Sequence, residues 1–344
     1  MDWINTITRL CACDAPSGFE SRIAPLAEEL LRPYADEISY DALGNIMAVK
    51  RCGKPGAARV LLDAHIDEIG FVMTGYAENG FLRFTGIGGH DERLLPASDI
   101  KILAEPPVYG VIDTLPPHLV KDGESDDTVK IDDLYIDAGL SPEGARERMP
   151  VGTPAVFVSE TVLLGERQIS AKALDNRASV AVIIGALELL GDAPLSADLH
   201  ILLSSQEEVG TRGAPTAAYA ADAAFGIILD VDFARQAEIL PEKGRPLGVG
   251  VVIARGPNMD RELVDRAEAI ARERGIPYQI TVEPGGNSGT NARPVQVSRA
   301  GVKTALLGVP VKYMHTPVET ADLRDFDAAA RLVCELIKEC GDNA

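Results

Sequence analysis

Two adjacent glutamates, Glu207 and Glu208, come shortly after a short apolar run at residues 200–203. A run of this length that stops at small polar residues is typical of a buried parallel strand. Ligands of open α/β sheets bind in the crevice outside the carboxyl ends of such strands. Neighbouring residues at a strand end point in different directions, so one carboxylate could bind a metal ion while the other faces a substrate. On its own, however, the pair is more typical of a solvated acidic turn.

Further imidazole and carboxylate side chains stand directly after other apolar runs or at the start of a predicted helix. They are His65, Asp67, Asp175, Asp230 and His315. Because the carboxyl ends of parallel strands meet at one edge of a sheet, we expect these side chains to converge. Two imidazoles and several carboxylates are the ligands that a pair of divalent metal ions needs. The other three histidines, His90, His118 and His200, do not share this position, and we interpret them as structural or surface residues.

The spacing of His65 and Asp67 supports this interpretation. Residues i and i+2 of an extended chain share a face, so Asp67 could accept the second ring N–H of a metal-bound His65. The charges also balance, because two divalent cations against three carboxylates leave one positive charge for a bridging hydroxide. Those three carboxylates are Asp175, Glu208 and Asp230. Metal binding can lower the pKa of water from 15.7 to about 7, and the remaining Glu207 could then move a proton to a leaving amine.

Each of these residues has a simpler explanation when it is taken alone. A single histidine is more often a hydrogen-bonded structural residue than a metal ligand. Asp175 with Asn176 makes a good helix cap, and Asp230 or Asp232 could begin a turn. Their shared position at strand ends is what favours a metal site.

Strands and helices alternate along most of the chain, which predicts a doubly wound, mainly parallel sheet. Strands are expected over 59–65, 200–204, 225–229, 247–254, 278–282 and 302–307, and helices over 3–13, 19–33, 175–190, 212–221, 260–274, 290–299 and 325–340. Residues 38–50 read as a hairpin. The simplest architecture is one catalytic α/β domain formed by residues 1–69 and 166–344.

Residues 70–165 interrupt this pattern with short alternating strands and turn signals. Asn79-Gly80 between two such strands is a strong hairpin signal. Residues 121–133 are polar and acidic, as in an exposed loop, and only residues 141–149 look helical. We therefore predict a small, inserted β-rich domain.

The composition narrows the possible partners. The 344-residue chain has a formal net charge of −19, which argues against nucleic acid and anionic membranes as partners. No apolar stretch reaches roughly 18 residues, and no signal peptide is visible at the N-terminus. Five cysteines without metal-binding spacing are typical of reduced thiols. We expect a cytoplasmic protein.

Several segments, in this order and at these intervals, resemble the M42 family of metallo-aminopeptidases, which includes the glutamyl and tetrahedral aminopeptidases. They are Ser17-Gly-Phe-Glu20, Ala64-His-Ile-Asp-Glu-Ile-Gly-Phe71, Ala173-Leu-Asp-Asn-Arg177, Gln206-Glu-Glu-Val-Gly210, Leu229-Asp-Val-Asp232 and Tyr313-Met-His-Thr-Pro-Val-Glu319. The resemblance covers nearly the whole chain. It implies a barrel-like dimerisation domain at the position of the β-rich insert, and homo-oligomers that are dimer-based dodecamers.

The resemblance also implies a role for each candidate residue. Two divalent metal ions, zinc or cobalt, would be held by His65, Asp175, Glu208, Asp230 and His315. Asp175 would bridge the two ions. The resemblance does not decide which of the two ions His65 and Asp230 each bind. Glu207 would be the general base, and Asp67 would orient His65. Two positions depart from the family pattern, because Asn176 and Asn291 stand where many members have aspartate.

These observations predict a metal-dependent aminopeptidase that removes N-terminal residues from short peptides. A metal-bridging hydroxide would attack the carbonyl, with a glutamate as general base. The alternative is a two-metal deacylase or carboxypeptidase of a related family, whose substrate carboxylate would need a basic residue such as Arg293 or Lys312.

Overall fold

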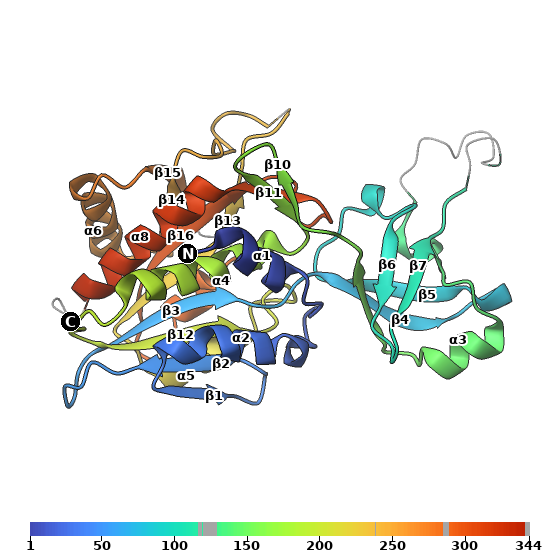
Figure 1. The fold of residues 1–344 in the computed structure, drawn as a ribbon, viewed down its shortest axis with the longest axis horizontal. Coiled ribbons are helices and arrows are strands. Elements are labelled where there is room, and N and C mark those ends of the chain that lie inside the picture. The colour runs from blue at the N-terminus through green and yellow to red at the C-terminus, as the bar shows by residue number, and fades with distance from the viewer. Residues whose placement is uncertain (116–118, 120–128, 238, 285–288, 341–344) are drawn as a thin grey trace.

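The largest element of the fold is an eight-stranded, mainly parallel sheet with helices packed against it (Figure 1). The computed structural model describes residues 1–115, 119, 129–237, 239–284 and 289–340. In spatial order the strands are β1 (Glu37–Tyr40), β2 (Ile46–Lys50), β12 (Asp198–Ser204), β3 (Arg59–His65), β13 (Phe225–Phe233), β16 (Lys303–Val311), β14 (Val251–Arg255) and β15 (Tyr278–Val282). This confirms the predicted α/β class.

Four adjacent strands at the centre of the sheet, β12, β3, β13 and β16, run parallel to one another. The residues of these strands are almost all buried, because helices cover the sheet. Ser204 at the end of β12 pairs with His65 at the end of β3. The carboxyl ends of the central strands therefore form one edge at nearly the same height.

The helices of this domain differ in how deeply they are buried. They are α1 (Trp3–Cys11), α2 (Ala24–Leu31), α4 (Leu174–Leu190), α5 (Gly213–Ala221), α6 (Arg261–Glu273), α7 (Ala292–Gln296) and α8 (Leu323–Cys340). Helix α4 contacts α1, α8 and strands β3, β13, β16 and β17 (Glu319–Asp322), and nearly all of its residues are buried. By contrast, α6 and α8 are amphipathic, with acidic and basic residues along their outer faces.

The inserted segment forms a closed six-stranded barrel that stands to one side of the α/β domain (Figure 1). Around the barrel the strands are β4 (Gly70–Tyr76), β5 (Leu82–Ile87), β8 (Ile136–Asp137), β7 (Val108–Ile112), β6 (Asp99–Ile102) and β9 (Pro154–Phe157). Helix α3 (Pro142–Arg148) lies beside them. Strands β4 and β5 form the predicted hairpin, and Asn79 and Gly80 in its turn both have positive φ. The barrel has its own apolar core.

A three-stranded antiparallel sheet joins the barrel back to the α/β domain. Its strands are β10 (Val162–Leu164), β11 (Gln168–Ala171) and β17 (Glu319–Asp322). It brings the segment after β16 beside the chain that leads into α4. Two segments far apart in the sequence, each with a candidate ligand, are thereby held together.

Some elements differ from the predicted ones. Strand β13 continues beyond residue 229 to Phe233, because its backbone pairs with β16 as far as Val311. Strand β14 runs antiparallel to β16. Helix α7 ends at Gln296 rather than residue 299. His118 and most of the loop predicted at 121–133 lie outside the described residues. None of the described helices is long and apolar enough to cross a membrane.

Candidate active site

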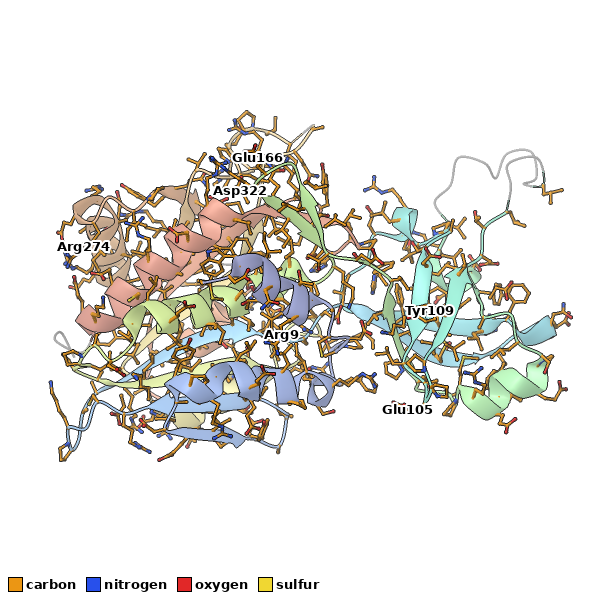
Figure 2. The ribbon with its side chains drawn as sticks, viewed as in Figure 1. Arg9, Glu105, Tyr109, Glu166, Arg274 and Asp322 are labelled. Atoms are coloured by element: carbon orange, nitrogen blue, oxygen red, sulfur yellow. The ribbon has the colours of Figure 1, made fainter. Side chains whose placement is uncertain are left out.

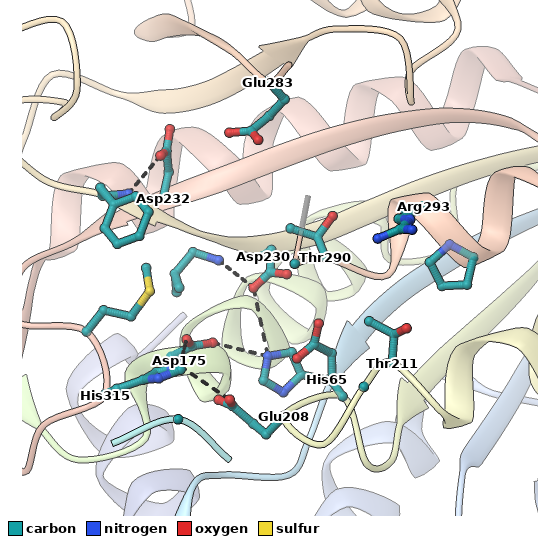
Figure 3. A pocket seen from close by; sticks show the side chains of 18 of the residues that line it. His65, Asp175, Glu208, Thr211, Asp230, Asp232, Glu283, Thr290, Arg293 and His315 are labelled. Atoms are coloured by element: carbon teal, nitrogen blue, oxygen red, sulfur yellow. Dashed lines mark hydrogen bonds and ion pairs between the residues drawn. The ribbon is translucent and has the colours of Figure 1, made fainter. Parts of the chain in front are cut away.

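The predicted site residues come from five different elements and meet at the carboxyl edge of the central strands (Figure 3). His65 ends β3, and Asp230 lies in β13. Asp175 lies at the start of α4, where Asp175 and Asn176 have non-helical backbone angles. Glu207 and Glu208 follow β12, and His315 follows β16. The fold therefore brings together, at one edge of the sheet, residues that are up to 250 positions apart in the sequence.

Two groups of potential metal ligands share one residue, Asp175. In the first, His65, Asp175 and Asp230 offer ligand atoms within 4.8 Å of one another, and in the second Asp175, Glu208 and His315 do the same. Asp175 Oδ1 lies 3.1 Å from His65 Nε2, whereas its Oδ2 lies 3.2 Å from His315 Nε2. Each carboxylate oxygen of Asp175 therefore faces a different group.

The remaining contacts complete each group. His65 Nε2 lies 3.8 Å from Asp230 Oδ1, and His315 Nε2 lies 3.3 Å from Glu208 Oε2. Both histidines thus point Nε2 toward the shared carboxylate, and the buried Nδ1 of His65 faces away from it.

Asp67 is fully buried behind His65 and receives several donors. Its Oδ1 lies 3.5 Å from His65 Nδ1 and accepts a hydrogen bond from the Glu207 N–H. Its Oδ2 accepts from the Ser17 hydroxyl and the Glu208 N–H. Burial opposes ionisation, but His65 and these donors lower the pKa of Asp67. Asp67 therefore ties the imidazole to the loop that carries both glutamates.

Burial and mutual repulsion raise the pKa values of the other carboxylates. Burial raises the pKa of Glu207 to about 9, with Asp230 and Glu208 adding to the effect and His65 opposing it. Burial, together with Asp175, raises the pKa of Asp230 to about 8. Burial lowers the pKa of His315, but hydrogen bonds to Asp175 and Glu208 outweigh it and raise the value to about 11. The buried carboxylates thus outnumber the positive charges available to them.

Glu319, at the start of β17, belongs to the site but was not found by sequence reasoning. Its Oε2 accepts a hydrogen bond from the Asp175 N–H, and its Oε1 accepts one from the His315 N–H. The side chain is only 2% exposed. One carboxylate therefore fixes the backbone of two candidate ligands. Its only sequence signal was its place at the end of the Tyr313–Glu319 motif.

The two asparagines that depart from the family pattern are both buried. The Asn176 amide donates to the Leu229 carbonyl, next to Asp230, which a carboxylate could not do. The Asn291 amide donates to the Ser204 hydroxyl at the end of β12. Neither side chain is among the residues that line the pocket described below. Both join neighbouring elements at this edge.

A pocket of about 930 Å³ opens over the candidate ligands. Its floor contains His65, Asp175, Glu207, Glu208, Asp230 and His315. The walls come from β13, α7 and the loops after β12, β15 and β16, and Gly89 of the inserted domain also lines it. The pocket leaves room for a small substrate directly above the carboxylates.

The chain matches known proteins over nearly its full length. A family model described as M42 glutamyl aminopeptidase matches residues 44–332. A lysyl aminopeptidase from Pyrococcus furiosus is 36% identical over 349 residues, covering 98% of this chain and 97% of the relative.

Solved structures agree with this match. A TET aminopeptidase from a marine sediment archaeon of the Thaumarchaeota has a TM-score of 0.92 at 30% identity and covers 98% of this chain and 96% of its own. The PhTET1-12s structure, a dodecamer in its asymmetric unit, has a TM-score of 0.87 at 31% identity and covers 98% of this chain and all of its own, at 100%. The chain belongs to the M42 glutamyl aminopeptidase family and is an aminopeptidase, a hydrolase of peptide bonds.

Proposed function

We propose that this aminopeptidase removes N-terminal residues from short peptides with two divalent metal ions. The proposed ligands are His65, Asp175, Glu208, Asp230 and His315, with Asp175 shared between the ions. The observation that carries the proposal is the position of the two Asp175 oxygens, each 3.1 to 3.2 Å from a different imidazole. A bridging carboxylate needs this arrangement.

The chemistry of the donor set fits metal ions. Imidazole and carboxylate ligands suit zinc and related first-row divalent metals. Buried carboxylate oxygens without partners among the described residues include Glu207 Oε1 and Glu208 Oε1. Since buried carboxylates are costly unless they are paired or coordinate metals, bound cations would supply the missing positive charge. We expect zinc or cobalt.

When bound, such ions would polarise the peptide carbonyl and make water a nucleophile at neutral pH. The rest of the chemistry falls to the chain's own residues. Glu207 lines the pocket and would take a proton from water and give it to the leaving amine. Asp67 would hold His65 in one tautomer by accepting from its Nδ1–H. Glu319 would hold the backbone at Asp175 and His315.

A second candidate function is supported by Arg293, which lines the pocket and could pair with a substrate carboxylate. A deacylase or carboxypeptidase of a related two-metal family would use such a residue. A free N-terminal amine separates the two functions, because only an aminopeptidase requires it.

The test is an assay of the metal-loaded protein on matched aminoacyl anilides with free and N-acetylated amines. We expect cleavage of the free-amine anilides and none of the acetylated ones. Cleavage of the acetylated anilides, or of peptides from the carboxyl end, would instead support the second function. Elemental analysis of the same preparation would give the metal and its ratio to the chain.

A further inference from the structure

We propose that one end of the pocket binds a basic side chain, so that the enzyme prefers lysine or arginine at the N-terminus of its substrate. This inference rests on the proposed function, because it requires the N-terminal residue to sit in this pocket. Its basis is a pair of carboxylates, Asp232 and Glu283, that line the pocket beyond the candidate metal ligands.

Asp232 follows Asp230 by two residues in β13. Because side chains two apart in a strand share a face, both point into the same cavity. Figure 3 shows Asp232 and Glu283 together at one end of the pocket, with Asp230 between them and His65. A substrate whose scissile bond lies over the candidate ligands could therefore extend its first side chain toward Asp232.

Neither carboxylate forms a close ion pair within the described part of the chain, although Arg245 is near enough to act on the charge of Asp232. Asp232 Oδ1 accepts a hydrogen bond from the Phe233 N–H, whereas the buried Oδ2 has no hydrogen-bond partner among the described residues. Among the ion pairs of the described residues, none involves Asp232 or Glu283. Buried polar atoms are nearly always paired in native proteins. An ammonium or guanidinium group of a substrate would supply the missing partner.

The walls around this end suit a long aliphatic stem. Val231 and Phe233 flank Asp232 in β13, and Met314 lines the same pocket. Lysine and arginine bury their methylene groups along apolar surface while the charged end reaches a polar partner. A leucine side chain would fill the apolar part but would leave the carboxylates unpaired.

Arg293, which alone among the described lining residues is a lysine or arginine, lies elsewhere. Figure 3 shows Arg293 on the side of the pocket near Thr211, away from Asp232 and Glu283. An acidic first residue would have to avoid two carboxylates to reach it. The separation of charges therefore favours a basic first residue, with Arg293 facing a different part of the substrate.

The test compares lysyl, arginyl, leucyl and glutamyl anilides with the metal-loaded enzyme. We expect kcat/KM for the basic anilides to exceed that for the leucyl anilide about tenfold or more, the size of one charge-assisted hydrogen bond. The ratio of lysyl to leucyl kcat/KM should fall about tenfold in Asp232→Asn and in Glu283→Gln. Titration calorimetry with free L-lysine and L-leucine should show the same loss without turnover.

Glu262→Gln is the matched control, because it removes an exposed carboxylate that pairs with Lys303 outside the pocket. It should leave the lysyl-to-leucyl ratio unchanged. A preference for the glutamyl anilide, or a ratio that neither variant alters, would overturn this inference and leave the aminopeptidase function standing. Failure to cleave any free-amine anilide would overturn the proposed function itself.

Discussion

Glu207 and Glu208 are neighbours in the sequence but have different surroundings. Glu208 Oε2 lies 3.3 Å from His315 Nε2, so this side chain is part of the second ligand group. Glu207 belongs to neither ligand group found among the described residues, and its Oε1 has no partner among them. A carboxylate beside a metal site, but not bound to it, is what proton transfer requires. This difference supports our proposal that Glu208 is a ligand and Glu207 the general base.

We predict that Glu207→Gln binds metal normally but loses most of its turnover. The amide keeps the shape of the side chain but cannot take a proton, and general-base catalysis typically contributes about 10²- to 10⁴-fold. An anilide assay with parallel elemental analysis measures both quantities. Glu208→Gln is the comparison, and we expect it to lose metal as well. A Glu207→Gln enzyme with near wild-type rate at full metal load would show that the base is elsewhere.

We predict that Glu319→Gln weakens metal binding without touching any ligand. Both oxygens of Glu319 accept backbone N–H groups, from Asp175 and His315, whereas a glutamine offers only one acceptor. Residues that orient metal ligands typically contribute about 10- to 100-fold in affinity. Competition of the apoprotein with a chromophoric chelator for Zn²⁺ measures this. Glu262→Gln should bind as the wild type does, and equal affinity in both variants would refute the role.

The sequence indicated which residues are candidate ligands, but it did not indicate Glu319, which contacts the backbone of two of them. His65, Asp175 and His315 were found because each stands where an apolar run ends or a helix begins. Glu319 follows a turn and begins a strand, so no periodicity marks it. Its partners are backbone N–H groups from segments 144 and 4 residues away. Such contacts depend on where β17 packs in the folded chain, and local sequence patterns carry no information about that position.

At the scale of elements, strand positions were predicted more reliably than strand directions. The central strands are continuous apolar runs, which is the pattern of strands buried on both faces. No sequence pattern indicated that β14 pairs antiparallel with β16, because a buried strand is apolar whether it runs parallel or antiparallel to its neighbour. Strand β13 was predicted too short, since Asp230 and Asp232 are polar but lie within the ladder.

Helix packing at the N-terminus depends on a close approach at Gly185 in α4. A Cβ atom built there would lie 2.4 Å from the Trp3 ring of α1 and 3.3 Å from Ala330 of α8. We predict that Gly185→Ala lowers the free energy of unfolding by about 1–2 kcal/mol, since overpacking costs about 1–3 kcal/mol and alanine regains up to about 1 kcal/mol of helix propensity. Thermal unfolding measures it.

Trp3 is the only tryptophan, so its fluorescence reports directly on this contact. We expect the emission of Gly185→Ala to shift as the ring is displaced. Gly144→Ala in α3 is the control, because a Cβ atom built there would lie an ordinary 3.5 Å from the Ser141 hydroxyl. That variant should be as stable as the wild type or slightly more so. An unchanged melting temperature and emission in Gly185→Ala would contradict the close approach.

At the scale of the whole molecule, a buried charge cluster joins the barrel to the α/β domain. Asp14 follows α1, and its carboxylate lies 2.6 Å from Lys101 of the barrel and 3.1 Å from Lys172. Lys172 also lies 2.6 Å from Glu68. Burial opposes ionisation of Asp14, but Lys172 and Lys101 lower its pKa. The junction is therefore held by charge as well as by backbone contacts.

We predict that Asp14→Asn destabilises the protein at neutral pH but not in acid. Because the folded-state pKa of Asp14 is below its unfolded value of about 4, its contribution is complete above pH 4 and is lost as the pH falls through the folded pKa. The loss at pH 7 should be about 1–3 kcal/mol. Denaturant unfolding between pH 3 and 7 measures the difference in free energy of unfolding between the wild type and the variant, which should narrow as the pH falls. Asp91→Asn, which removes an exposed ion pair with Arg93, should change the free energy of unfolding little. If the stability difference between the wild type and Asp14→Asn did not depend on pH, the ionisation of Asp14 would not be its cause.

Some apolar side chains of the barrel are exposed to solvent and are not part of its core. Tyr109 and Val111 of β7 are 63% and 42% exposed, and Figure 2 shows Tyr109 on the barrel. Protein interfaces contain more aromatic residues than the rest of the protein surface does. The relative PhTET1-12s is a dodecamer in its asymmetric unit. We propose that barrels pair through this strand to form dimers, which build a similar assembly.

We predict that the wild-type protein elutes as a particle with twelve times the 36.6 kDa mass of the chain, and that Tyr109→Glu reduces that mass. A carboxylate in place of an exposed ring leaves the barrel core intact but would be buried without a partner in a dimer, which is costly. Light scattering after size exclusion measures the mass, and Tyr219→Glu, at a tyrosine 61% exposed on α5, is the control. Since the ligand groups lie within one chain, the smaller particle should still bind metal. A wild-type monomer, or a Tyr109→Glu particle of full mass, would place the contact between subunits elsewhere.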